Sequence, residues 1–286
     1  MIEFANSLKD SPARSQAIAE AVAAIAPLLT ERPKLGLILG TGLGNLISEI
    51  TAPQEITYSK IPHFPRSTAM AHRGSLFVGR ICELPVLVMA GRCHLYEGYS
   101  REHVTLPTRV LRALGCETLL VTNAAGGINP QYQVGDVMAM DDHLDLMHSR
   151  GLFPVQTSRH WIQPRGTYDQ ELILQTLAIG RSADFSVQRG VYVGVKGPNY
   201  ETRAEYRFFR RIGGDVVGMS TIPEVTVAAE LGMRVLGIST VTNVARPDVK
   251  QTVTSDEVVH VAGLAEPKVR AIVKGIATNL SKAKSE

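Results

Sequence analysis

Residues 34–44 read KLGLILGTGLG, and this segment decides the fold class, because it combines a buried strand with a glycine-rich turn. Residues 35–39 are apolar and are bounded by Pro33 and Gly40, a pattern typical of a strand that is covered on both faces. The same pattern predicts further strands at 76–81, 85–90, 118–122, 134–140, 190–195, 215–219 and 234–241. Between them, helical spacing of apolar residues predicts helices at 13–30, 101–114, 169–181, 201–212, 223–231 and 255–283. This alternation predicts an α/β fold whose central mixed sheet is flanked by helices.

The chain length of 286 residues allows one domain or two. The unusual motifs run from Thr41 to Asn243 without a linker or a repeat, which favours one domain over residues 1–286. Within it, residues 1–33 contribute an N-terminal helix that is expected to pack on the body.

The composition excludes several classes of protein. Apolar residues make up 44% of the chain and charged residues 20%, which excludes a disordered chain, a collagen and a coiled coil. The formal net charge of +3 comes from basic residues scattered among acidic ones, so nucleic acid is not an expected partner. No apolar run reaches the roughly 20 residues of a membrane span.

The cysteines and histidines give little sign of a bound metal. Cys82, Cys93 and Cys116 are odd in number and lack CxxC spacing, which argues against a disulfide framework or a zinc ribbon. They fit a reducing, cytoplasmic compartment. His143 and His148 have acidic neighbours, but a solvated loop explains them better than a metal site.

The glycine loop Gly40–Gly44 invites two interpretations besides a plain tight turn. A dinucleotide fingerprint would need its third glycine at position 45, which is Asn45, so a nicotinamide-dependent oxidoreductase is disfavoured. A small phosphate loop fits better, because glycines let backbone amides approach an anion and Thr41 adds a hydroxyl.

The segment 91–99, GRCHLYEGY, follows a predicted strand and carries three polar side chains in alternation. In an extended segment Arg92, His94 and Tyr96 would share one face. The guanidinium of Arg92 suits a phosphate, and Glu97 is placed to orient and charge His94.

Four more segments lie at predicted strand ends, each with an ordinary structural alternative. They are VTNAAGGINP at 121–130, KGPNYET at 196–202, GMSTIPE at 218–224 and TVTN at 240–243. A tyrosine at 200 could stack on a ring and Glu201 could accept from ring N–H groups, although a glutamate in a helical first turn needs no ligand. Ser220 lies where a helix N-terminus could bind an anion, or where a serine or threonine simply caps the helix.

Together these motifs resemble the trimeric class of purine nucleoside phosphorylases, from about residue 34 to about residue 258. The resemblance also covers IPHFPRST at 61–68, AHRG at 71–74 and VGDVMAMDDH at 134–143. The motifs follow one another in the order of that family, which makes the match far more specific than any one of them.

The resemblance implies roles for residues at matching positions. The implied phosphate site consists of Thr41, His72, Arg92, His94, the amide of Ala124, and Ser220. The implied nucleoside site consists of Tyr96, Tyr200, Glu201, Met219 and Asn243. His94, Glu201 and Asn243 would be the catalytic members.

The implied reaction is the reversible phosphorolysis of a purine nucleoside to the free base and ribose 1-phosphate. Phosphate is a co-substrate, and neither a metal nor an organic cofactor is implied. Asn243 favours the 6-oxopurines inosine and guanosine and their 2′-deoxy forms, whereas related methylthioadenosine phosphorylases carry Asp near this point.

Two positions depart from the family pattern. Ser255 stands where a histidine usually contacts the 5′-hydroxyl, which keeps a 5′-methylthioadenosine phosphorylase as the alternative activity. Trp161 takes the place of an aromatic residue that reaches the site of a neighbouring subunit in the homotrimer. A noncatalytic nucleoside-binding protein is a third possibility, which the apparent phosphate site argues against.

Overall fold

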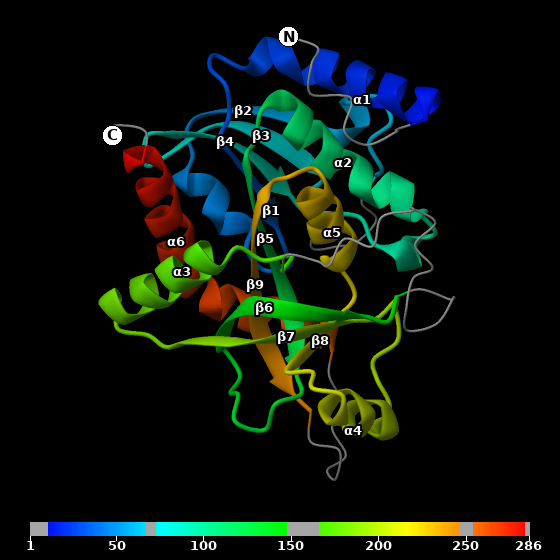
Figure 1. The fold of residues 1–286 in the computed structure, drawn as a ribbon, viewed down its shortest axis with the longest axis vertical. Helices are drawn as coiled ribbons and strands as arrows, with labels where there is room; N and C mark the ends of the chain where they lie inside the picture. Colours follow the sequence, from blue (N-terminus) through cyan, green and yellow to red (C-terminus); the bar gives the residue numbers. More distant parts are fainter. Residues whose placement is uncertain (1–10, 67–72, 148–165, 246–253, 284–286) are drawn as a thin grey trace.

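The computed structural model describes residues 11–66, 73–147, 166–245 and 254–283. Its centre is a nine-stranded mixed sheet with the strand order β2-β3-β4-β1-β5-β8-β7-β6-β9. The strands are β1 (Leu35–Leu39), β2 (Thr51–Thr57), β3 (Ser75–Ile81), β4 (Leu84–Ala90), β5 (Thr118–Gly127), β6 (Val137–Asp145), β7 (Val187–Gly194), β8 (Val216–Gly218) and β9 (Arg234–Val244). The structure therefore has the single-domain α/β architecture that the sequence predicts (Figure 1).

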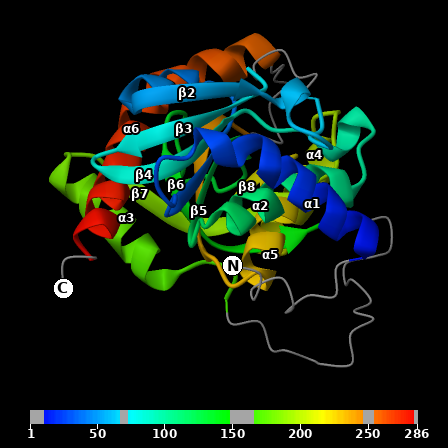
Figure 2. The same ribbon diagram turned by 90° about the horizontal axis from the view of Figure 1, so that it is seen from above.

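Helices cover the sheet in two layers that lie on opposite sides in both views (Figures 1 and 2). The helices are α1 (Pro12–Ile25), α2 (Arg101–Leu114), α3 (Gln170–Ser182), α4 (Arg203–Arg211), α5 (Ile222–Glu230) and α6 (Ser255–Lys282). Helix α2 contacts α1 and α5 in one layer, and α3 contacts α6 in the other. Helix α4 stands apart at the end of the molecule beyond β7 and β8 (Figure 1). No helix in the described part of the chain is both long and apolar enough to cross a membrane.

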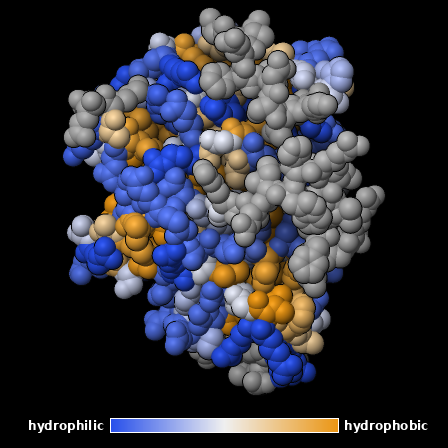
Figure 3. Space-filling model, in the orientation of Figure 1, coloured by the Kyte–Doolittle hydropathy of each residue, from blue (hydrophilic) through white to orange (hydrophobic). Residues whose placement is uncertain are grey.

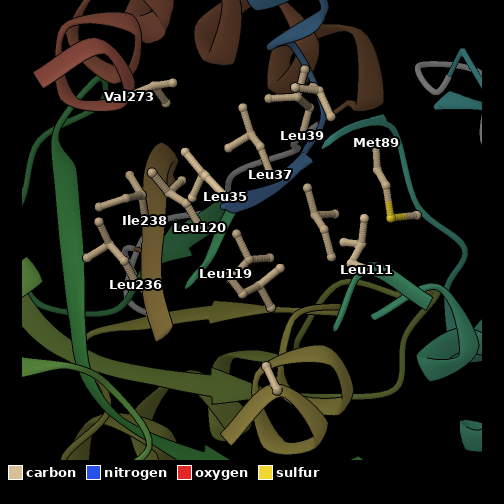
Figure 4. Close-up of a cluster of buried hydrophobic side chains, with 14 of the residues drawn as sticks. Leu35, Leu37, Leu39, Met89, Leu111, Leu119, Leu120, Leu236, Ile238 and Val273 are labelled. Carbon is tan, nitrogen blue, oxygen red and sulfur yellow. The ribbon is translucent and has the colours of Figure 1, made fainter. Parts of the chain in front are cut away.

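The core lies between the sheet and these two layers. All five residues of β1 are buried, which explains why its sequence is a continuous apolar run rather than an alternating one. Side chains of β1, β5 and β9 meet Leu111 of α2 on one side and Val273 of α6 on the other (Figure 4). On the surface, Figure 3 shows hydrophilic residues over much of one face, with hydrophobic residues in separate patches.

Strand β5 is shared by two parts of the sheet. Along its whole length it pairs in parallel with β9. On its other edge it pairs with β1 as far as Val121, and with β8 from Gly126 onward. Between Val121 and Gly126 that edge has no strand partner among the described residues, so the sheet opens beside residues 122–125.

Four parallel strands bring their carboxyl ends to this opening. Strands β4, β1, β5 and β9 run in the same direction. The segment after β4 begins at Gly91, the one after β1 at Gly40 and the one after β9 at Ala245, whereas β5 itself continues past the opening. Sites in α/β folds form where such ends converge. The topology thus gathers segments that are 200 residues apart in the sequence.

The glycines of the loop after β1 are required by packing. A Cβ atom on Gly40 would lie 2.6 Å from the carbonyl oxygen of Thr122, and one on Gly42 would lie 2.4 Å from the Cβ of Ala262 in α6. The amide of Gly40 donates to the hydroxyl of Thr122 at 2.9 Å. Two of the three glycines therefore hold β1 against β5 and α6, a role that the sequence analysis did not assign to them.

All eight predicted strands are present; β1 has the predicted bounds, and the other seven are shifted at one end or both. Strand β5 continues to Gly127, five residues beyond its predicted end, and β6 begins three residues later than predicted. The sequence analysis missed β2, whose residues are exposed except for the half-buried Ile56. Its Pro53 is tolerated because β2 is an edge strand that pairs only with β3 among the described residues.

Replacing Gly42 by alanine should destabilise the protein by about 1–3 kcal/mol, because the added methyl group overpacks the contact with α6. The φ of +80° at Gly42 adds strain for any other residue. Gly44→Ala is the matched control, because nothing lies within 4 Å of a Cβ at that position. Urea unfolding of the two variants measures the difference, and equal stabilities would contradict the packing role of Gly42.

Candidate active site

A pocket of about 850 Å³ opens where the strand ends converge. Its lining comes from five separate parts of the chain between Gly40 and His260, namely residues 40–41, 92–126, 198–206, 217–220 and 242–260. It brings together all the predicted site residues whose side chains the structure describes, namely Thr41, Arg92, His94, Tyr96, Ala124, Tyr200, Glu201, Met219, Ser220 and Asn243. The predicted residues His72 and Trp161 lie outside the described residues, and Ser255 is described only as the first residue of α6.

One part of the pocket is a cluster of hydroxyl groups around Arg92. The Nη1 of Arg92 donates to the Oγ of Ser220 at 3.0 Å and to the Oγ1 of Thr221 at 3.3 Å. The Nδ2 of Asn123 also donates to the Oγ1 of Thr221, at 2.9 Å. A guanidinium beside two hydroxyl groups is suited to an anion, since each of them can donate to it.

A buried ion pair holds the guanidinium in place. The Nε of Arg92 lies 3.1 Å from the Oε1 of Glu224 in α5, and the two side chains are 3% and 6% exposed. The sequence analysis assigned no role to Glu224, because a glutamate in the first turn of a helix is ordinary. Its burial beside a pocket arginine is visible only in the fold.

Backbone strain marks the same corner. Thr221 precedes α5 and has a φ of +73°, which is unusual for a β-branched residue. The sequence analysis allowed Thr221 or Ser220 to cap the helix, but no side-chain capping bond forms at Thr221. Its hydroxyl instead accepts from Arg92 and Asn123, so the strained backbone serves the polar cluster and not the helix.

Two contacts orient the imidazole ring of His94. Its Nδ1 lies 2.9 Å from the Oε1 of Glu97, as predicted, and its ring stacks on that of Tyr96 with the centroids 4.7 Å apart. The expected extended segment stops at His94, because Leu95–Glu97 form a short 3₁₀ helix, η4. Arg92, His94 and Tyr96 nevertheless line one pocket, through the turn rather than through strand alternation.

The loop after β7 leads Glu201 into the pocket. A Cβ at Gly197 would lie 2.3 Å from the sulfur of Met219 and 3.2 Å from the ring of Tyr96, so this glycine permits a close approach. Helix α4 begins only at Arg203, with a capping box between Thr202 and Glu205. Glu201 therefore lies before the helix rather than in its first turn, and its carboxylate is available to the pocket.

Tyr206 of α4 lines the pocket together with Glu201 and Asn243, and the sequence analysis gave it no role. Its side chain packs against a small buried cluster that includes Phe209 and Val217. Burial raises the pKa of Glu201, while its own backbone amide and the nearby Tyr206 oppose the rise by stabilising the charged form.

Helix α6 forms another wall of the pocket. Asp256, Val258, Val259 and His260 line it, and the sequence analysis assigned a role to none of them. The first turn of α6 is capped by Thr254, whose side chain accepts from the amide of Glu257. Within the described ranges, no three histidine, cysteine, aspartate or glutamate side chains are grouped to hold a metal ion.

Known proteins resemble this chain over the segments that build the pocket. Residues 34–278 match a family model described as the phosphorylase superfamily. Purine nucleoside phosphorylase 1 of Bacillus subtilis is 44% identical over 262 residues, which cover 91% of this chain and 97% of that protein. The purine nucleoside phosphorylase of Bos taurus is 42% identical over 221 residues, covering 74% of this chain and 76% of that protein.

A solved structure gives the same result for the fold. The crystal structure of a Schistosoma purine nucleoside phosphorylase in complex with hypoxanthine matches with a TM-score of 0.83 and 32% sequence identity. The match covers 95% of this chain and 99% of that one. The two proteins thus share the fold over nearly their whole length.

Replacing Glu224 by glutamine should reduce the free energy of unfolding by about 3–5 kcal/mol, since the buried charge of Arg92 loses its partner. The matched control is Glu230→Gln, which makes the same change at an exposed position of α5. Urea unfolding at neutral pH compares the two variants. If Glu224→Gln is no less stable than Glu230→Gln, the ion pair does not hold this part of the site together.

Proposed function

The chain belongs to the phosphorylase superfamily and, within it, to the purine nucleoside phosphorylases, and we propose that it acts on 6-oxopurine nucleosides. The reaction is the reversible phosphorolysis of inosine, guanosine or their 2′-deoxy forms to the free base and (deoxy)ribose 1-phosphate. One observation carries this proposal: a single pocket holds both the Arg92 hydroxyl cluster and the side chains of Glu201 and Asn243.

The Arg92 hydroxyl cluster would bind phosphate. Arg92 and Ser220 present donors to an anion, and Thr41, His94 and the amide of Ala124 line the same pocket. Glu97 holds His94 through Nδ1, and we assign its Nε2 to the phosphate. His72 is assigned to phosphate by resemblance alone.

Bond cleavage would proceed through a sugar with oxocarbenium character. The C1′–N9 bond breaks, its electron pair leaves with the purine, and a phosphate oxygen forms the new bond to C1′ from the opposite face. The configuration at C1′ inverts, and no covalent intermediate with the enzyme is needed. The bound phosphate stabilises the positive sugar before it attacks, because opposite charges attract strongly in a water-poor site.

The leaving base would be stabilised by Asn243 and Glu201. Negative charge that moves onto the purine reaches N7 and O6, where the amide of Asn243 can hydrogen-bond. The carboxylate of Glu201 accepts from N1–H of a 6-oxopurine and thereby orients the ring. Tyr96, Met219 and Tyr200 would pack around the ribose and the base.

The proposal also covers the alternative substrate, the cofactor and the location of the enzyme. The alternative activity toward 5′-methylthioadenosine rests on Ser255, which replaces a histidine usual in the family. Phosphate is a co-substrate, and we propose no metal or organic cofactor. We place the enzyme in the cytoplasm, without nucleic acid or membrane partners.

Base release tests the proposed activity. Inosine, guanosine, adenosine and 5′-methylthioadenosine are each incubated with the enzyme, with and without phosphate, and the free base is measured. We expect rapid release from inosine and guanosine only when phosphate is present. No release from either of them would refute the proposal, release without phosphate would indicate a hydrolase, and preference for 5′-methylthioadenosine would favour the alternative.

We also propose a homotrimer in which Trp161 reaches the site of a neighbouring subunit. The 46% exposure of Tyr200, a pocket residue, supports a further covering group. Phe208 and Ile212, in and just beyond α4, add exposed apolar surface nearby, and hydrophobic and hydrophilic residues lie side by side around α4 in Figure 3.

Light scattering should give a mass three times that of one chain. Trp161→Ala should raise the nucleoside KM without changing this mass, because the indole contributes contact area to the substrate. A stable monomer with full activity would contradict the shared site.

A further inference from the structure

We propose that Asn123 and Thr221 are positioning residues for phosphate, because they form a hydrogen-bond chain that directs the hydroxyl proton of Ser220 into the pocket. This inference deepens the proposed function and rests on it. Strand β5 supplies Asn123, and the turn between β8 and α5 supplies Ser220 and Thr221. The family resemblance implies no role for Asn123 or Thr221.

The hydroxyl group of Thr221 has both of its acceptor positions occupied. Its Oγ1 accepts from the Nδ2 of Asn123 at 2.9 Å and from the Nη1 of Arg92 at 3.3 Å. The same oxygen lies 3.0 Å from the Oγ of Ser220. Because a hydroxyl group has two acceptor positions and one proton, the proton of Thr221 is left for Ser220. The hydrogen bond between the two hydroxyl groups therefore runs from Thr221 to Ser220.

The same count determines what the hydroxyl group of Ser220 offers to a ligand. Its Oγ accepts from Thr221 and, at 3.0 Å, from the Nη1 of Arg92. Both acceptor positions are then filled, and the proton remains for a ligand. Ser220 lines the pocket, whereas Thr221 is completely buried. Of the two hydroxyl groups, Ser220 is thus the one that meets a ligand, and it meets the ligand as a donor.

The backbone of Ser220 is fixed separately by Tyr192. The amide of Ser220 donates to the hydroxyl of Tyr192 at 3.2 Å, and that hydroxyl donates to the carbonyl oxygen of Ser220 at 3.2 Å. Tyr192 is completely buried, and a Cβ on Gly218 would lie 2.4 Å from its hydroxyl oxygen. With the backbone held in this way, the direction of the Ser220 proton depends on the hydrogen-bond chain.

Packing holds Asn123 at the start of the chain. Its side chain belongs to a residue that is only 2% exposed, and a Cβ on Gly40 would lie 2.7 Å from its Cα. On the other side, Asn123 pairs with Ser239 of β9. The glycine loop and β9 thus fix the position from which Nδ2 reaches Thr221, which lies 98 residues later in the sequence.

A donor that is already oriented suits an oxygen atom without a proton, such as those of phosphate. The other implied phosphate contacts, Arg92 and the amide of Ala124, are donors as well. Donors that are oriented before the anion binds cost no reorganisation when it binds or when it attacks the sugar. A freely rotating hydroxyl group would turn a lone pair toward the anion for part of the time. The chain should therefore raise the affinity for phosphate and leave nucleoside binding unaffected.

The first test is Asn123→Asp, which should reverse the chain. A carboxylate only accepts, so Thr221 must donate to it, and Ser220 must then donate to Thr221 and turn a lone pair toward phosphate. Loss of a hydrogen bond to a charged ligand should raise the phosphate KM by about tenfold to a hundredfold. The nucleoside KM should stay within about twofold, since the change concerns the binding of one substrate.

A Ser220→Ala background separates this reversal from the effect of the added charge. The new carboxylate repels phosphate whether or not residue 220 has a hydroxyl group. Asn123→Asp should therefore weaken phosphate binding several-fold less in Ser220→Ala than in the wild type, as expected for residues that act through one another. Equal fold-changes in the two backgrounds would overturn the proposal. Equality is also the result expected if the amide oxygen of Asn123 faces Thr221, because the donor order would already be reversed.

A second pair of variants tests the chain without burying a charge. Thr221→Ser keeps the hydroxyl group and should leave the phosphate KM within about twofold of the wild type. Thr221→Val removes it at nearly constant volume and should raise the phosphate KM by about threefold to tenfold, because the neutral hydrogen bond that orients Ser220 is lost. Equal phosphate KM values for Thr221→Ser and Thr221→Val would overturn the proposal.

Thr226→Val is the matched control for Thr221→Val. It makes the same substitution in α5, where the hydroxyl of Thr226 donates to the carbonyl oxygen of Ile222 at 2.7 Å. Thr226 is not part of the pocket lining, so the phosphate KM should not change. A rise as large as that in Thr221→Val would assign the effect to the helix and would overturn the positioning role.

Calorimetry with inorganic phosphate distinguishes the two possible failures. If the wild-type enzyme releases no base from any purine nucleoside with phosphate, the proposed function fails. Phosphate that binds the wild type more tightly than Thr221→Val would then still support the positioning role. Equal phosphate affinities of the wild type and Thr221→Val would overturn that role even if the enzyme is fully active. Phosphate that neither binds the wild type nor stimulates base release would overturn both.

Discussion

The opening in the sheet beside residues 122–125 is the constraint on which the rest of the structure depends. Strand β5 is paired along one edge by β9 for its full length, and its other edge is divided between β1 and β8. A strand has only two edges, so the gap between these two partners is fixed once both pairings form. The pocket forms at this gap, because β1, β4 and β8 end there and the segments that follow them line it.

The polar groups in the pocket are held by interactions whose loss would cost much folding free energy. Arg92 and Glu224 are both buried, and each would be an uncompensated charge without the other. Thr221 adopts a strained positive φ that brings its hydroxyl to Arg92 and Asn123. Such strain persists only where surrounding structure enforces it, and here β8 and α5 do so from both ends.

The entry into α4 has a corresponding role at Glu201. Because Thr202 and Glu205 satisfy the helix N-terminus between themselves, Glu201 is released from capping. One local sequence motif therefore determines that the carboxylate of Glu201 can face the pocket.

The sequence by itself determined the fold class, eight of the nine strands and the set of segments that meet in the pocket, because buried strands and glycine turns are local patterns. The edge strand β2 was not predicted, because an exposed strand that contains proline lacks the apolar pattern of a buried strand. Only the tertiary structure decided that Gly40 and Gly42 serve packing, and that Glu224 holds Arg92 in the pocket. The physical reason is that burial, ion pairing and hydrogen-bond direction depend on partners that are distant in sequence and that converge only after the strands have paired.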